Sequence, residues 1–263
     1  MGTAILSGLL KSGFDPNQVA VSTNSTSSAE TLTDEYGVLS FAMENGDDAN
    51  QMAVAGANVV LICVKPAFVI EVLADIADSL DDNALIISVA AGVTTAAMEK
   101  VLPEDVGVVR AMPNTPAIVS RAITGISAGS RATEWAVETS VQLFETVGKA
   151  LVLDESKIDA LSTISGSGPA YFFYLVEQLL SAAKHQGFTE AEAALLVNET
   201  FLGAAELLVF SEQSPEALRK QVTSPNGTTE RAIARMSETD LQKMFIEATD
   251  AALARAKELA AGK

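Results

Sequence analysis

Residues 59–66 are Val-Val-Leu-Ile-Cys-Val-Lys-Pro, and residues 84–92 are Ala-Leu-Ile-Ile-Ser-Val-Ala-Ala-Gly. Each run is apolar at consecutive positions, so a strand formed from it presents apolar side chains on both faces. Such strands are typical of a parallel sheet that is covered by helices on both sides. The segment between them, residues 67–80, has apolar residues every three or four positions, which predicts a helix with one buried face. Together they predict an α/β domain.

The same alternation of strands and helices extends over residues 1–153 and predicts a Rossmann-like, doubly wound sheet. The predicted strands are Val19–Ser22, Val38–Ser40, Val59–Val64, Ala84–Ala90, Val106–Met112, Ile123–Ala128 and Ala150–Leu153. Residues 154–263 are predicted to form an all-helical second domain. Its expected helices are Ala170–Gln186, Glu190–Ser211, Pro215–Val222, Thr229–Met236 and Leu241–Leu259. The first of these is so apolar that we expect it to lie at a subunit interface.

Composition excludes several functions. The chain carries 34 acidic and 17 basic residues, a net charge of −17, which disfavours nucleic acids and anionic membranes as partners. With one cysteine, Cys63, and one histidine, His185, we expect no disulfide and no metal site. Uninterrupted apolar stretches such as Val59–Val64 are too short to cross a bilayer. We therefore predict a cytoplasmic protein.

Three turns that follow predicted strands are candidates for a ligand site, because ligands of doubly wound sheets bind at the carboxyl ends of the strands. The first contains Cys63-Val64-Lys65-Pro66. The second, Ala90-Ala91-Gly92, is small enough for a flat ring to approach its backbone, although close packing of a helix explains it equally well. The third, Arg110–Pro116, contains two prolines, and we expect them to hold Asn114 outward.

Three further segments precede predicted helices. Thr23–Ser28 is rich in hydroxyls and lacks the acid that binds the ribose of NAD, which favours NADP weakly; capping of the next helix is an equal alternative. Ser165–Ala170 is best explained as a helix start, with Ser167 or Gly168 as the cap and Pro169 in the first turn. Thr223–Thr229 would present several free N–H groups to a carboxylate, and an ordinary capped helix start is equally supported.

In this order and spacing, Arg110–Thr115, Ser165–Ala170 and Thr223–Thr229 resemble pyrroline-5-carboxylate reductase, the last enzyme of proline biosynthesis, over essentially the whole chain. The resemblance implies NADPH as cofactor, with NADH possible, and a helical domain that forms homodimers and larger assemblies, commonly decamers. It places Asn24 where members of this type often have an arginine, which weakens the expected grip on the 2′-phosphate of NADPH.

The resemblance also implies the site residues. Those expected at the cofactor are Met1, Gly2, Asn24, Ser25, Asn50, Cys63, Val64, Lys65, Pro66, Ala90, Ala91, Gly92 and Asn114. Those expected at the substrate are Glu212, Ser224, Asn226, Gly227, Thr228 and Thr229. Thr229 is expected to be catalytic, as the hydroxyl that hydrogen-bonds to the imine nitrogen or relays a proton to it.

The start of the chain departs from the family pattern. A helix at Met1–Gly13 comes first, and only Met1-Gly2 remain of the glycine-rich turn that normally follows a first strand. We expect the natural protein to have about ten more residues, one strand and its turn. A translation start placed too late, a fragment and a shortened natural chain are the three explanations. Without that strand, neighbouring strands are expected to have unpaired backbone groups.

Two other functions are alternatives for this sequence. The related β-hydroxyacid dehydrogenases use a lysine shortly after a Gly-x-Gly turn, but Gly166-Ser167-Gly168 is followed by no such lysine. A non-catalytic, truncated reductase-like protein would keep the oligomerising helices without holding NADPH. The missing glycine turn favours this alternative, whereas the intact segment Ser224–Thr229 opposes it.

Overall fold

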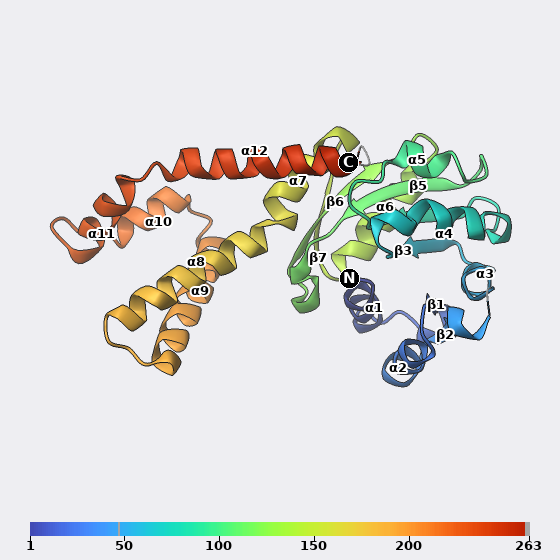
Figure 1. Cartoon of the computed structure of the whole chain (residues 1–263), viewed down its shortest axis with the longest axis horizontal. Coiled ribbons are helices and arrows are strands. Elements are labelled where there is room, and N and C mark those ends of the chain that lie inside the picture. Colours follow the sequence, from blue (N-terminus) through green and yellow to red (C-terminus); the bar gives the residue numbers. More distant parts are fainter. Residues whose placement is uncertain (47, 261–263) are drawn as a thin grey trace. The chain divides into compact units, whose positions relative to one another are not determined.

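The structure is a computed structural model that describes residues 1–46 and 48–260 (Figure 1). By its internal contacts the chain forms two compact units. The first unit comprises Met1–Ser167 together with the end of helix α12 (Leu241–Ala260) from Ala252 onward, and the second comprises Gly168–Ala251. Each unit is described below by itself.

The strands of the first unit are divided between two sheets. Strands β1 (Ala20–Thr23) and β2 (Leu39–Ala42) form a parallel pair. The larger sheet has the order β3-β4-β5-β6-β7, formed by β3 (Val59–Ile62), β4 (Leu85–Ser88), β5 (Gly107–Met112), β6 (Ala122–Ala128) and β7 (Gly148–Val152). All neighbours in it are parallel except β5 and β6. Among the described strands β1 pairs only with β2 and β3 only with β4, which is the gap in pairing that the sequence predicts.

The larger sheet is covered on both faces, as its apolar strands predict. Ile86 of β4 belongs to a core cluster with helix α4 (Val69–Ile76), whereas Leu85 and Ile87 belong to a second cluster. That second cluster includes residues of α1 (Gly2–Lys11) and α6 (Glu134–Glu145). Because successive strand residues point to opposite faces, these clusters lie on opposite sides of the sheet, and all four residues of β4 are buried.

The remaining helices of the first unit are short. They are α2 (Thr26–Tyr36), α3 (Ala49–Val54), α5 (Thr95–Glu99) and α7 (Ile158–Leu161), with 3₁₀ turns at Pro16–Gln18, Met43–Asn45, Pro66–Phe68, Ala77–Ser79, Thr115–Val119 and Glu155–Lys157. The predicted single helix over residues 67–80 is α4 flanked by two of these tighter turns, which are common at helix ends. Residues 154–167 pack with the sheet: Ile158 is fully buried, and a Cβ at Gly125 would lie 2.7 Å from Leu161.

The start of α8 (Gly168–His185) differs from the prediction. A π-helical turn, Ser162–Gly166, follows α7 directly, and Ser167 has right-handed helical backbone angles. Its N–H donates to the carbonyl of Ser162 at 2.9 Å, so the chain enters α8 from a helical turn. Ser167 is therefore not the extended N-cap that the sequence suggested, because a helix that continues from a preceding turn has no free first turn to cap.

The second unit is entirely helical in its described residues, with α9 (Glu190–Ser211), α10 (Pro215–Gln221) and α11 (Thr228–Ser237) after α8. Helices α8 and α9 form a hairpin in which the rings of Phe172 and Phe201 meet edge to face, with centroids 5.2 Å apart. The predicted capping box is confirmed: Thr189 accepts from the Glu192 N–H, and the Glu192 carboxylate accepts from the N–H and hydroxyl of Thr189.

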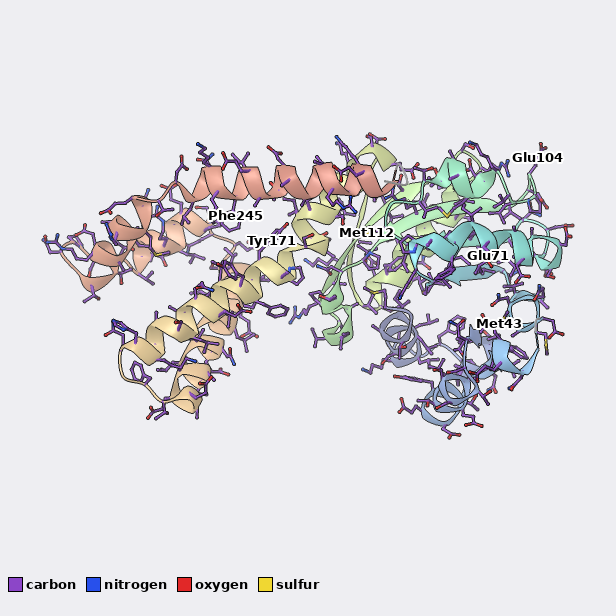
Figure 2. The ribbon with its side chains drawn as sticks, viewed as in Figure 1. Met43, Glu71, Glu104, Met112, Tyr171 and Phe245 are labelled. Atoms are coloured by element: carbon purple, nitrogen blue, oxygen red, sulfur yellow. The ribbon has the colours of Figure 1, made fainter. Side chains whose placement is uncertain are left out.

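Large apolar side chains of the second unit are exposed in the single chain. On α8, Phe173 is 59% and Tyr174 62% exposed, and Phe245 also projects from α12 (Figure 2). Helix α9 is apolar around most of its circumference. With a mean hydropathy of 1.6 and little of its surface buried, its length and composition alone would allow it to cross a membrane. This corrects the expectation from uninterrupted runs, because scattered acids such as Glu199 break every run without lowering the mean much.

Candidate functional site

The start of α1 meets the turn after β3. A Cβ built on Gly2 would lie 3.3 Å from both Cβ and Sγ of Cys63. Part of the Cys63 residue is exposed, but its sulfur faces this helix, and burial raises the pKa of the thiol to about 11 against a smaller lowering by the N-terminal ammonium. The structure thus brings together two predicted cofactor residues, Gly2 and Cys63, that are distant in sequence.

The remainder of this turn is open. Val64 and Lys65 are exposed, and Pro66 begins a 3₁₀ turn in which the Phe68 N–H donates to the Lys65 carbonyl at 2.9 Å. The Lys65 ammonium forms no ion pair with any described residue. A free cation is therefore available beside the end of β3.

The turn after β4 carries the next predicted cofactor residues. Ala90 is buried, and its N–H donates to the Ser88 hydroxyl at 3.3 Å. Gly92 has a φ of 75°, in the left-handed region where a side chain is strained, so the turn needs glycine there. Small side chains leave the backbone of this turn approachable at the carboxyl end of a central strand.

Asn50 connects three elements of the first unit. From α3, its Oδ1 accepts from the Ser22 hydroxyl of β1 at 2.8 Å, and its Nδ2 donates to Asp75 of α4 at 3.0 Å. The side chain thus ties the end of β1 to a helix of the larger sheet. In this structure its polar atoms are used for this bridge.

The turn between β1 and α2 contains a carboxylate that the sequence analysis missed. Ser25 caps α2 by accepting from the Ser28 N–H at 3.3 Å, and Asn24 is exposed. The Glu44 carboxylate accepts from the Thr26 N–H at 2.9 Å, and the Glu44 N–H donates to the Asn24 carbonyl at 3.2 Å. No local pattern signals this residue, because it follows the next strand and reaches back across 18 positions.

Asn114 points inward, contrary to the prediction that two prolines hold it outward. It is buried, its Nδ2 donates to the carbonyl of Ser165 at 2.9 Å, and its Oδ1 accepts from the Ile123 N–H at 3.0 Å. The amide thus gives hydrogen-bond partners to two backbone groups while its own donor and acceptor are satisfied, which explains why it turns in. It therefore joins the loop after β5 to the π-helical turn.

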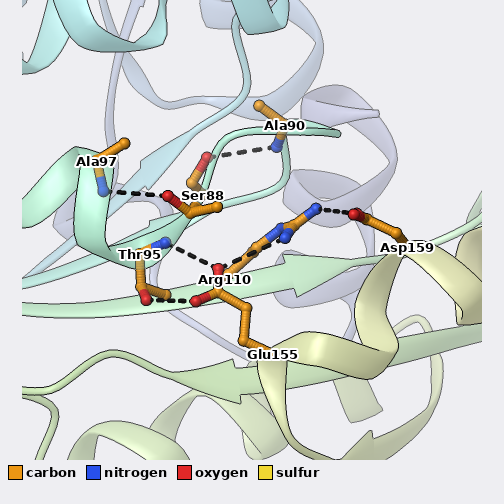
Figure 3. A network of polar contacts seen from close by, with 8 residues as sticks. Ser88, Ala90, Thr95, Ala97, Arg110, Glu155 and Asp159 are labelled. Atoms are coloured by element: carbon orange, nitrogen blue, oxygen red, sulfur yellow. Dashed lines mark hydrogen bonds and ion pairs between the residues drawn. The ribbon is translucent and has the colours of Figure 1, made fainter. Parts of the chain in front are cut away.

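Ion pairs around the buried side chain of Arg110 form a network beside the larger sheet (Figure 3). Arg110 of β5 is 3% exposed, and its guanidinium lies 2.7 Å from Asp159 and 3.5 Å from Glu155. Glu155 in turn accepts from the N–H of Thr95 at 2.8 Å and from its hydroxyl at 2.7 Å. The Arg110 Nε is buried without a partner among the described residues. In the sequence Arg110 is part of a candidate motif, and no role follows for it from the motif alone.

The predicted substrate residues lie in the second unit, in the turn before α11. Asn226 has a φ of 59°, and the Gly227 N–H donates to the Ser224 carbonyl at 3.0 Å. A Cβ at Gly227 would displace the Ser224 hydroxyl and lie 3.0 Å from the Ser224 carbonyl oxygen, so this turn favours glycine. The Asn226 N–H is already taken by the Glu230 carboxylate at 2.8 Å. Two of the expected donors are therefore used within the turn.

The N–H groups of Thr228 and Thr229 remain available. They begin α11, Gly227 provides no side-chain cap, and neither N–H has a backbone partner in the described part of the chain. Thr229 is half-buried and Glu212 is exposed at the end of α9, where its φ of 54° turns the chain. No group of three His, Cys, Asp or Glu residues within the described ranges could hold a metal.

Comparisons with known proteins agree along the chain. Residues 155–259 match the family model described as pyrroline-5-carboxylate reductase dimerisation, and residues 1–92 match that described as NADP oxidoreductase, coenzyme F420-dependent. The chain is 36% identical to a pyrroline-5-carboxylate reductase of Corynebacterium melassecola, over 98% of this chain and 95% of that protein. It is also 36% identical to the Pseudomonas aeruginosa enzyme of the same name, over 99% of this chain and 93% of that protein.

Solved structures give the same result. A pyrroline-5-carboxylate reductase from Coxiella burnetii superposes with a TM-score of 0.91 and 37% identity, covering 98% of this chain and 94% of that chain. The Plasmodium falciparum pyrroline carboxylate reductase, solved with NADP bound, superposes with a TM-score of 0.84 at 21% identity, over 99% and 94% of the two chains. The second comparison supports the fold alone.

Proposed function

The chain belongs to the pyrroline-5-carboxylate reductase family, and from this membership we infer that it reduces 1-pyrroline-5-carboxylate to L-proline. It is an NAD(P)H-dependent oxidoreductase that acts on a C=N bond. A hydride adds to the imine carbon of the ring, which becomes C5 of proline, the C=N π bond breaks, and the nitrogen gains a proton. The comparisons offer no support for the non-catalytic alternative.

NADPH is the cofactor, with NADH as the proposed alternative, and when bound it supplies the hydride. Two features of the first unit fit a dinucleotide at the carboxyl ends of the strands: the turn Ala90–Gly92 is small, and Met1 gives the start of α1 no side-chain cap. We propose that Lys65 offers a cation near the phosphates, and that Asn24 and Ser25 lie near the adenine ribose. Met1, Gly2, Asn50, Val64, Pro66 and Asn114 complete the proposed cofactor site.

The uncapped first turn of α11 supports a substrate-carboxylate site. The N–H groups of Thr228 and Thr229 point out of the helix start, where the helix dipole favours an anion. The turn formed by Ser224, Asn226 and Gly227 sets the position of that start, and Glu212 is the remaining residue proposed at the pocket. The Thr229 hydroxyl would then orient the ring nitrogen and relay its proton, with positioning as the larger contribution.

Substitution of Thr229 tests this assignment. Thr229→Val should lower kcat/KM by about a hundredfold, the lower end of the range for a positioned proton donor, whereas Thr229→Ser, which keeps a hydroxyl, should retain most of it. The assay follows oxidation of NADPH in the presence of 1-pyrroline-5-carboxylate, with proline identified as the product. A Thr229→Val enzyme with unchanged kcat/KM would remove Thr229 from the mechanism.

The helical region is a dimerisation domain by its family match, which supports a homo-oligomer. We propose that residues 1–153 bind the cofactor, that residues 154–263 bind substrate and form the dimer, and that dimers assemble into decamers. The exposed apolar side chains of α8 and α9 would be covered there rather than by lipid. We also propose a cytoplasmic protein without nucleic-acid or membrane partners, in keeping with its charge of −17. Light scattering after size exclusion measures the assembly.

A further inference from the structure

We propose that Arg110 is a positioning residue for the cofactor, which acts through Glu155 on the turn Ala90–Gly92. This inference rests on the proposed function, because it takes that turn as part of the cofactor site. Arg110 itself lies within the sheet and is almost fully buried, so it acts on the turn through other residues.

The turn Ala90–Gly92 is held at both of its ends. On one side, β4 holds it through sheet pairing that ends at Ser88, whose hydroxyl accepts from the Ala90 N–H. On the other side, Thr95 begins α5, and both its N–H and its hydroxyl donate to the Glu155 carboxylate, at 2.8 and 2.7 Å (Figure 3). The position of the Glu155 carboxylate therefore sets where the far end of the turn lies.

The Glu155 carboxylate is itself held by Arg110. Arg110 lies opposite Ser88 in the pairing of β5 with β4, so its backbone is fixed by the same strand that starts the turn. One nitrogen of its guanidinium faces Glu155 and another faces Asp159. A planar fork can hold two carboxylates in fixed directions, whereas an ammonium is a single point charge. The strand, the guanidinium and the carboxylate thus form one connected support.

Positioning explains the ion pairs of Arg110 better than stability does. A buried ion pair is weak evidence for stability, because the cost of desolvating the charges offsets their attraction. Arg110 carries that cost with one buried nitrogen unpaired. Asp159 and Glu155 are each about one-quarter exposed, so water remains within reach of both carboxylates. The geometric consequence of the network is at Thr95, three positions after the last residue of the proposed cofactor turn.

Arg110→Lys tests the proposal, with Arg131→Lys as the matched control. Arg131 is a half-buried arginine of the same unit, but its guanidinium donates to the carbonyls of Leu102 and Pro103, at 3.3 and 2.8 Å, beyond the other end of α5. Arg110→Lys should raise KM for NADPH about tenfold, the scale of effect of removing a group that orients a binding residue, and leave KM for the imine within about twofold. Arg131→Lys should change neither constant, although each variant lowers Tm.

A double-mutant cycle tests the route through Glu155. If Arg110 acts through that carboxylate, Glu155→Gln raises KM for NADPH alone, and combining it with Arg110→Lys adds little further. Additive effects of the two substitutions would overturn the route. Should Arg110→Lys fail to fold, Glu155→Gln and Thr95→Ala carry the same expectation for NADPH, and wild-type KM values in both would overturn the proposal.

The activity of the wild-type chain distinguishes a failure of the proposed function from a failure of the positioning role of Arg110. A wild-type chain that does not reduce the imine contradicts the proposed function. An active wild type whose Arg110→Lys variant keeps its KM for NADPH, or whose Arg131→Lys variant shows the same rise, contradicts only the positioning role. Binding of NADPH measured by its fluorescence, without substrate, gives a readout that does not depend on turnover.

Discussion

Replacing Glu44 by glutamine should shift the cofactor preference toward NADPH. The Glu44 carboxylate accepts from the Thr26 N–H at 2.9 Å, beside Asn24 and Ser25, where we propose the adenine ribose. A 2′-phosphate bound there would meet a negative charge and an N–H that is already occupied. NADH has a hydroxyl at that position, so its binding should change little. Glutamine keeps an oxygen that can accept from Thr26 but removes the charge.

The expected magnitude follows from Coulomb's law. Two unit charges roughly 6 Å apart, the separation of groups that compete for one N–H, interact by about 0.7 kcal/mol in water. A phosphate monoester carries about −1.5 to −2 charges, which raises the repulsion to about 1 kcal/mol or slightly more. Screening by physiological salt lowers it again. At low salt, where this screening is weakest, we therefore expect the ratio of kcat/KM for NADPH to that for NADH to rise about fivefold.

The assay compares kcat/KM with each cofactor at low and high salt. Glu30→Gln is the control, because Glu30 lies exposed on α2 with the same charge and forms no hydrogen bond to the start of the helix. Its ratio should change much less, and the effect of Glu44→Gln should shrink at high salt. An unchanged ratio in Glu44→Gln, or an equal change in Glu30→Gln, would refute the electrostatic reasoning.

Three further predictions concern the fold and its titrating groups. Phe144→Ala should destabilise the first unit by about 3–5 kcal/mol in chemical denaturation, because the ring is fully buried between α6 and the sheet. Gly8→Ala should cost about 1–3 kcal/mol despite better helix propensity, since its Cβ would overlap Val147 and lie 3.0 Å from the Thr146 carbonyl oxygen; a melting temperature at or above wild type would show that the helix can shift. Hydrogen bonds from the Thr189 N–H and hydroxyl lower the pKa of Glu192, so this carboxylate stabilises the start of α9 at neutral pH, and the contribution is lost as pH falls through the lowered pKa. The acid-induced loss of helicity should therefore be weaker in Glu192→Gln, and circular dichroism of the two proteins between neutral and acidic pH tests this.

Features that depend on neighbours in the sequence were predictable. The apolar run of β4 requires cover on both faces, and Ile86 and Ile87 indeed belong to opposite core clusters. Thr189 and Glu192 form their capping box within four residues, and the bounds of α9 agree with the prediction. In these cases the partners are adjacent in the chain, so periodicity and residue type suffice.

Features that depend on partners far away in the sequence were not predictable. Two prolines could not show that Asn114 turns inward, because its partner carbonyl belongs to Ser165, 51 positions away. Hydroxyls after β1 gave no sign that a carboxylate from beyond β2 would reach them. The Ser165–Ala170 segment looked like a capped helix start, yet a preceding π-helical turn carries the chain straight into α8.

The sequence by itself determined the class of this protein: a parallel α/β unit, a helical dimerisation region, and the motifs that identify the pyrroline-5-carboxylate reductase family. Hydrophobic periodicity, turn residues and motif spacing depend on residues that are close together in the chain, so the sequence alone is enough to recognise them. Only the tertiary structure decided which polar groups meet. Arg110 and Glu155 are 45 positions apart, and their pairing depends on how the strands are ordered in the sheet and how the segment after β7 folds back over its edge.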